Sequence, residues 1–146
     1  MGSYFKQARF AIFWLVVFMI IRLILGARGV PYERGTIVSM VMLSWLAALF
    51  YGAFCRRFKD YKWYQAALQG GTIAFSAQVL IFAATVISFL VGVDTYFNHP
   101  IALNVPEAVE LTQALGIRVV GLLVNTVAAS IIGAIGWATG VLLPKS

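Results

Sequence analysis

Residues 117–143 read IRVVGLLVNTVAASIIGAIGWATGVLL, and Arg118 is their only charged member. A helix needs about 20 mostly apolar residues to cross the roughly 30 Å hydrocarbon core of a bilayer. This stretch is therefore long enough to span a membrane. Three further apolar runs of comparable length cover residues 10–27, 36–55 and 70–93. The sequence therefore predicts four transmembrane helices.

The composition of the whole chain supports the same fold class. Hydrophobic residues make up 62% of the 146 residues and charged residues 11%, whereas soluble domains carry roughly 45–50% and about 25%. We therefore predict a single all-α integral membrane domain over residues 1–146, built as a compact four-helix bundle. The net charge of +6 comes from residues beside the spans, where basic side chains contact anionic lipid headgroups. It does not predict a nucleic-acid partner.

Basic residues are distributed unevenly between the two sides of the predicted bundle. Lys6, Arg9 and Lys145 lie in the two tails, whereas the opposite side has Arg28 and Arg34. Lys and Arg concentrate in cytoplasmic loops, so we expect both termini to face the cytoplasm, most simply in a bacterial inner membrane. The second connector adds four residues that we expect to anchor the chain to anionic lipid on that side: Arg56, Arg57, Lys59 and Lys62.

The third connector, residues 94–116, is too long for a simple turn. Its segment 104–107, Asn-Val-Pro-Glu, has the composition of a helix start, because Pro suits the first turn and acidic side chains favour the positive end of the helix dipole. We therefore predict a short interfacial helix at about 106–115. A continuous helix over 106–143 would overshoot the bilayer. The polar residues of the resulting outer cap are Asp94, His99, Glu107 and Glu110.

Two arginines, Arg22 and Arg118, fall within the predicted spans at similar depth near the outer interface. The simplest interpretation is that each extends its guanidinium to lipid headgroups. They could instead pair with the acids of the outer cap, or line an outward-facing pocket for carboxylate or phosphate. Deeper in the bundle, we expect Gln78, Thr85 and Asn125 to form hydrogen bonds between helices or to line a path for a small solute.

The fourth apolar run carries small residues on one face. With Arg118 and Asn125 they recur at steps of three or four residues, which places them on one side of a helix. Small side chains let helix backbones approach closely in lipid, so we expect this face to contact protein, either within the chain or in another subunit. The members are Gly121, Ala129, Gly133, Gly136 and Gly140.

The sequence contains no pattern typical of a catalytic, cofactor or metal site. His99 is the only histidine and Cys55 the only cysteine, and we expect them on opposite sides of the membrane, where they cannot share a metal or a reaction. The first functional hypothesis is therefore a structural or accessory subunit that assembles through the small-residue face, as a homo-oligomer or in a larger membrane complex. The alternative is a small oligomeric channel or transporter with an outward-facing cationic pocket. An enzyme acting on lipid through the outer-cap side chains is a third hypothesis.

Overall fold

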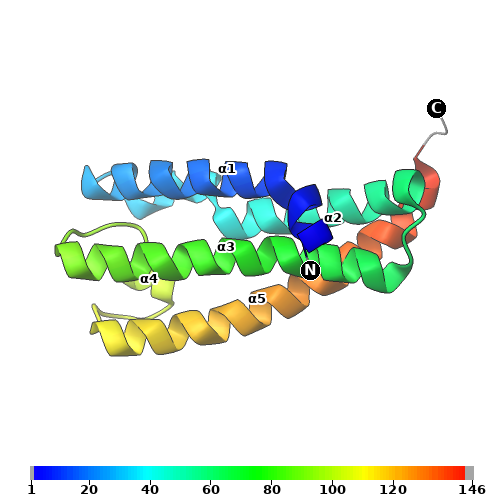
Figure 1. The fold of residues 1–146 in the computed structure, drawn as a ribbon. Helices are drawn as coiled ribbons and strands as arrows, with labels where there is room; N and C mark the ends of the chain where they lie inside the picture. Colours follow the sequence, from blue (N-terminus) through cyan, green and yellow to red (C-terminus); the bar gives the residue numbers. More distant parts are fainter. Residues whose placement is uncertain (1, 144–146) are drawn as a thin grey trace.

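The computed structural model of the chain describes residues 2–143, except for the side chains at positions 2 and 36. Four long helices form a bundle: α1 (Gly2–Ala27), α2 (Met40–Lys59), α3 (Trp63–Val91) and α5 (Leu111–Thr139). Figure 1 shows α3 in the middle, flanked by α1 and α5. All four are long and apolar enough to cross a membrane, and the described residues include no strand. The prediction of an all-α membrane bundle with four transmembrane helices is confirmed.

The second span begins with a short 3-10 helix, η1 (Tyr32–Val38), and then breaks before α2. Ser39 makes this break with an extended backbone, and its hydroxyl accepts a hydrogen bond from the Met42 N–H at 3.3 Å. A Ser side chain at this position satisfies one of the backbone donors that a helix start leaves unpaired. The chain ends its last span in a second 3-10 turn, η2 (Gly140–Leu142).

The short helix of the third connector does not lie at 106–115, and that prediction is wrong. It lies at Pro100–Leu103 (α4), whereas 106–110 are not helical and α5 begins at Leu111. The His99 ring accepts a hydrogen bond from the Ile101 N–H at 3.3 Å and so caps the start of α4. Asn104 then ends the helix with a φ of 56°. Asn tolerates this left-handed conformation better than most residues.

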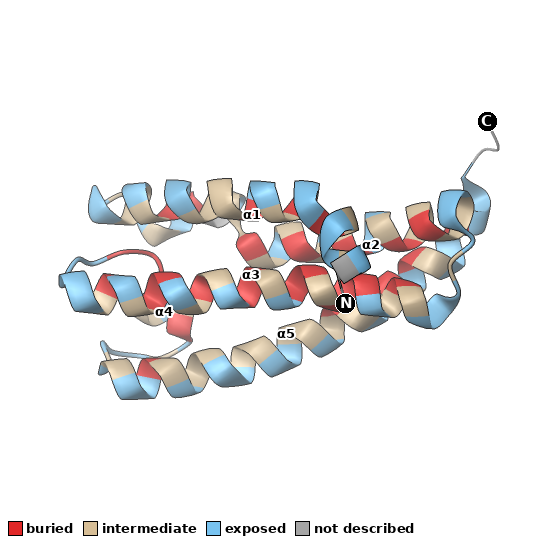
Figure 2. Cartoon of the chain, in the orientation of Figure 1, coloured by how far each residue is buried: buried red, intermediate tan, exposed pale blue. Residues whose placement is uncertain are grey.

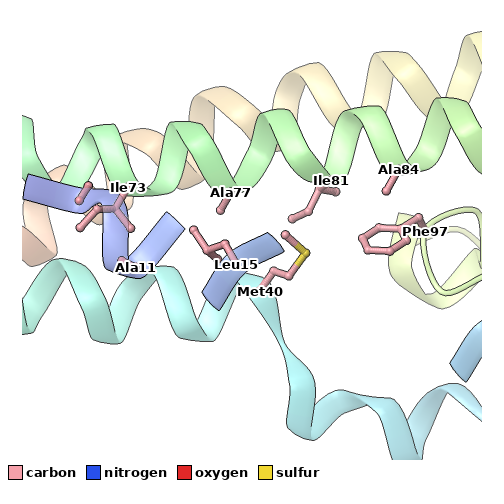
Figure 3. Packing of buried hydrophobic residues seen from close by; sticks show 9 residues of the cluster. Ala11, Leu15, Met40, Ile73, Ala77, Ile81, Ala84 and Phe97 are labelled. Atoms are coloured by element: carbon pink, nitrogen blue, oxygen red, sulfur yellow. The ribbon is translucent and has the colours of Figure 1, made fainter. Parts of the chain in front are cut away.

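The core of the bundle lies around α3, which contacts each of the other three long helices. Figure 2 shows its buried positions along the middle of the structure, whereas the outer faces of α1 and α5 are largely exposed. The largest buried cluster joins Leu15 of α1, Met40 of α2 and Ile81 of α3 with Phe97 of the third connector (Figure 3). Exposed residues on the outer faces are mostly apolar, as expected for helices in contact with lipid.

The small-residue face of α5 is covered by helices of the same chain. A Cβ atom added to Gly136 would lie 2.2 Å from the carbonyl oxygen of Leu49 in α2. A Cβ atom on Gly133 would lie 2.6 Å from the carbonyl oxygen of Ala66 in α3. Both positions therefore need glycine, because α2 and α3 approach α5 backbone to backbone.

The other members of this face divide into two groups. Ala129 and Gly140 are also buried where α2 and α3 approach α5. A Cβ atom on Gly140 would lie 2.6 Å from the carbonyl oxygen of Ala53. Gly121 is different, because the nearest atoms to its added Cβ are 3.8 Å away or farther. Helices of the same chain therefore occupy the face at Gly133, Gly136 and Gly140, and assembly with other subunits stays a prediction.

Candidate site between Arg22 and Arg118

A cavity of about 140 Å³ lies between Arg22 and Arg118, and both side chains line it. It lies at the end of the bundle formed by the C-terminal parts of α1 and α3, η1, α4 and the start of α5, which we call the arginine end (left in Figure 1). The rest of the lining includes Tyr32, Met40, Ile81, Tyr96, Phe97 and Ala102. Sequence reasoning placed the two arginines at similar depth, and the structure brings them to one cavity.

Arg22 is enclosed by protein, with 7% of its surface exposed. Its Nη1 donates to the backbone carbonyls of Gly35 at 3.0 Å and Val38 at 3.2 Å, which ties α1 to the end of η1. Its guanidinium carbon lies 5.1 Å from the centre of the Tyr96 ring and 5.4 Å from that of Tyr32, within the range of cation–π attraction. The side chain does not extend outward to headgroups as the simplest interpretation of the sequence expected.

Arg118 connects three parts of the arginine end. Its Nε donates to the Thr85 hydroxyl of α3 at 3.1 Å, and its Nη1 donates to the Ala102 carbonyl of α4 at 3.2 Å. Its Nη2 donates to the Phe97 carbonyl at 2.7 Å. Thr85 is fully buried and also donates to the Ile81 carbonyl at 2.9 Å. Thr85, predicted as a polar residue of the bundle, thus serves as a partner of Arg118.

No Asp or Glu side chain is among the residues that line this cavity in the described part of the chain. The guanidinium groups donate to carbonyls and one hydroxyl, whereas Asp94, Glu107 and Glu110 are exposed. The expected pairing with these three acids is therefore not seen. His99 stacks on Tyr32 with ring centres 5.1 Å apart, but it is not among the residues that line the cavity.

Residues 95–97, which we call the aromatic roof, bring the Tyr96 and Phe97 rings into the lining of the cavity. Tyr96 and Phe97 are each 2% exposed. The Tyr96 hydroxyl donates to the Val30 carbonyl at 2.9 Å, which attaches the roof to the first connector. Gly26 makes this possible, because an added Cβ there would lie 2.5 Å from the Tyr96 backbone nitrogen. Tyr96 and Phe97 were not among the site residues predicted from the sequence, and Gly26, a small residue near the end of the first predicted span, is the signal for this close packing.

The two deeper polar residues lie outside the cavity. Asn125 donates from Nδ2 to the Gly121 carbonyl of its own helix at 2.9 Å. Gln78 of α3 is 4% exposed, and its Oε1 would lie 3.8 Å from a Cβ on Gly121. Both side chains therefore pack beside Gly121, where α3 and α5 face each other.

The opposite end of the bundle, which we call the basic end, carries the second connector. Arg56 donates to the carbonyls of Trp137 at 3.1 Å and Ala138 at 3.3 Å, and its guanidinium carbon lies 4.1 Å from the centre of the Trp137 ring. It therefore caps the C-terminus of α5. Lys59 and Lys62 are exposed, and the predicted contact of this connector with anionic lipid stays a prediction.

These features define a small polytopic α-helical protein with membrane-spanning helices and a cationic cavity at one end. Compared with known proteins, the chain matches no family model, no curated protein and no solved structure. Among the described residues, no group of three or more His, Cys, Asp or Glu side chains could hold a metal ion. The cavity presents guanidinium, hydroxyl and aromatic groups to a ligand.

Proposed function

We propose that this chain is a membrane protein that binds an anion in the cavity between Arg22 and Arg118. The observation that carries the proposal is that two guanidinium groups line one cavity that no carboxylate lines. A charge held away from water is costly unless an opposite charge accompanies it. A carboxylate or phosphate would supply that charge and could accept hydrogen bonds from both guanidinium groups.

The start of α2 adds to the attraction for anions. Ser39, which caps α2, and Met40 and Val41, which begin its first turn, line the cavity. The first backbone N–H groups of a helix have no partner within it, and the helix dipole makes this end positive. The cavity therefore combines two side-chain charges with the positive end of a helix of 20 residues.

Binding fits the geometry better than conduction. Beyond Met40 and Ile81 the core between α1, α2 and α3 is an apolar cluster that includes Leu15, Ile73 and Ala77 (Figure 3). A charged solute in such a core would lose its hydration without gaining partners. With the basic residues of the second connector on the cytoplasmic side, the cavity faces outward, and the chain acts as an outward-facing anion receptor.

Ligand-dependent thermal stability of the purified chain in an uncharged detergent tests this proposal. We expect sulfate, inorganic phosphate or acetate to raise the melting temperature of the wild type in a saturable manner, because a ligand at 100 times its Kd stabilises the folded state by about 2.7 kcal/mol. The double variant Arg22→Gln, Arg118→Gln should lose this response. The matched control is Arg28→Gln, which removes an exposed charge at the same end. An identical response in the wild type and the double variant would overturn the proposal.

A further inference from the structure

We infer that the anion is the phosphate of a membrane lipid, which enters the cavity through the side of the bundle while its acyl chains stay in the bilayer. This inference rests on the proposed function. The first reason is depth. Arg22 precedes the last residue of α1, Ala27, by five positions, and Arg118 follows the first residue of α5, Leu111, by seven. At 1.5 Å per residue, the two side chains start about 7.5 and 10.5 Å from the helix ends.

The second reason is that the aromatic roof, of which Tyr96 and Phe97 line the cavity, is held in place by hydrogen bonds. Tyr96 is attached to the first connector through the Val30 carbonyl, and the Thr95 hydroxyl lies 2.7 Å from the Ser88 hydroxyl of α3. The Thr95 N–H also donates to the Asn98 side chain at 2.7 Å. An anion that enters between the roof and the first connector would have to break the bond between Tyr96 and Val30, whereas a lipid already lies beside the bundle.

The third reason is the chemistry of the flanks. Ser39, Met40 and Val41 line one side of the cavity, and Ala102 of α4 and Arg118 of α5 line another. Chain neighbours of these residues are apolar and strongly exposed: Met42 at 57%, Ile101 at 54% and Val119 at 49%. Ile37, two residues before Ser39, is 88% exposed. A charged interior between apolar flanks fits an amphiphile, with its headgroup inside and its chains outside.

The size of the cavity agrees with a headgroup. A cavity of about 150 Å³ holds a molecule the size of benzene, so about 140 Å³ accommodates a phosphate with its nearest carbons but not acyl chains. The several oxygens of a phosphate can accept from two guanidinium groups at once. Met40, Ile81 and Ala102 in the lining would contact the ester and glycerol carbons.

Native mass spectrometry of the full chain, released from micelles that contain phosphatidylglycerol and diacylglycerol in equal amounts, tests the inference. We expect the wild type to retain phosphatidylglycerol and not diacylglycerol, and Arg22→Gln with Arg118→Gln to reduce retention at least tenfold. Arg28→Gln should retain lipid as the wild type does. Ala102→Phe and Val41→Phe, on the two flanks, fill the cavity without changing its charge, and each folded variant should lose the lipid. Thermal melting and gel filtration identify the folded variants.

A parallel titration with inorganic phosphate distinguishes the two possible sources of the bound phosphate group, a lipid headgroup and a free phosphate ion. If inorganic phosphate binds as tightly as phosphatidylglycerol and the arginine double variant loses both, the proposed function stands and the lipid inference is overturned. Equal retention of phosphatidylglycerol by the wild type and the double variant also overturns the inference, because the lipid then binds elsewhere. If neither phosphatidylglycerol nor inorganic phosphate binds the wild type, both the proposed function and the lipid inference are overturned.

Discussion

The guanidinium of Arg118 donates from Nη2 to the backbone carbonyl of Phe97 at 2.7 Å. This bond connects α5 to the aromatic roof, because Phe97 is one of the three roof residues and is almost fully buried. The same side chain binds Thr85 and Ala102. One residue therefore holds α3, α4 and the roof in place around the cavity that it lines. A role in binding and a role in folding converge on Arg118, so variants must be designed to separate them.

Replacing Arg118 with Gln should loosen the roof before it unfolds the bundle. A hydrogen bond to a charged group contributes about 1.5–3 kcal/mol, and Gln cannot reach all three acceptors. We expect faster amide hydrogen exchange over residues 95–103, by tenfold or more, while exchange in the middle of α3 stays unchanged. Mass spectrometry of exchange in detergent measures both regions. The control Arg28→Gln should leave residues 95–103 protected, and unchanged exchange in the Arg118 variant would contradict the role assigned to it.

The four spans and the similar depth of the two arginines could be predicted, because both follow from the position of residues along a helix and the thickness of a bilayer. The roof could not be predicted in the same way. Its structure depends on contacts far apart in sequence, such as the Tyr96 hydroxyl with the Val30 carbonyl. The helix start expected at Pro106 is wrong because the short helix begins at Pro100 instead, with His99 before it. Both prolines suit a first helical turn, so this preference alone does not choose between them.

Gly136→Ala should destabilise the bundle, whereas Gly121→Ala should be tolerated. A Cβ at position 136 would lie 2.2 Å from the Leu49 carbonyl oxygen, whereas at position 121 the nearest atom is 3.8 Å away. Overpacking of this kind costs about 1–3 kcal/mol, and Ala favours a helix over Gly by about 1 kcal/mol where there is room. Thermal melting of the two variants in detergent should therefore shift in opposite directions.

Size measurements on the same two variants test what the face contacts. We expect wild type, Gly136→Ala and Gly121→Ala to have the same mass by light scattering while they remain folded, because the face is covered within one chain. A mass that halves in Gly136→Ala would show that the face joins subunits after all. The spacing of Gly133, Gly136 and Gly140 predicts that another helix approaches closely. It does not predict whether that helix belongs to the same chain or to another subunit, because the small-residue pattern is the same in both cases.

Arg56→Gln should weaken the basic end of the bundle by about 1 kcal/mol, through loss of the cation–π contact with Trp137. The variant also loses the cap on the Trp137 and Ala138 carbonyls. Arg56→Lys should restore only part of the stability, because an ammonium lacks the planar shape that stacks on a ring. Thermal melting measures the series, with Lys59→Gln as the control because Lys59 is exposed. Equal stability of Arg56→Gln and Lys59→Gln would show that Arg56 serves only as surface charge.

The orientation in the membrane can be tested with single cysteines, because Cys55 is 1% exposed and should react poorly. In a Cys55→Ala background, Glu107→Cys places a thiol at the arginine end and Lys59→Cys places one at the basic end; both native residues are exposed. Since Lys and Arg concentrate on the cytoplasmic side, we expect a membrane-impermeant maleimide to label the Glu107→Cys chain in intact spheroplasts. The Lys59→Cys chain should react only after permeabilisation. The opposite pattern would place the cavity on the cytoplasmic side, and its anion would then come from the inner leaflet.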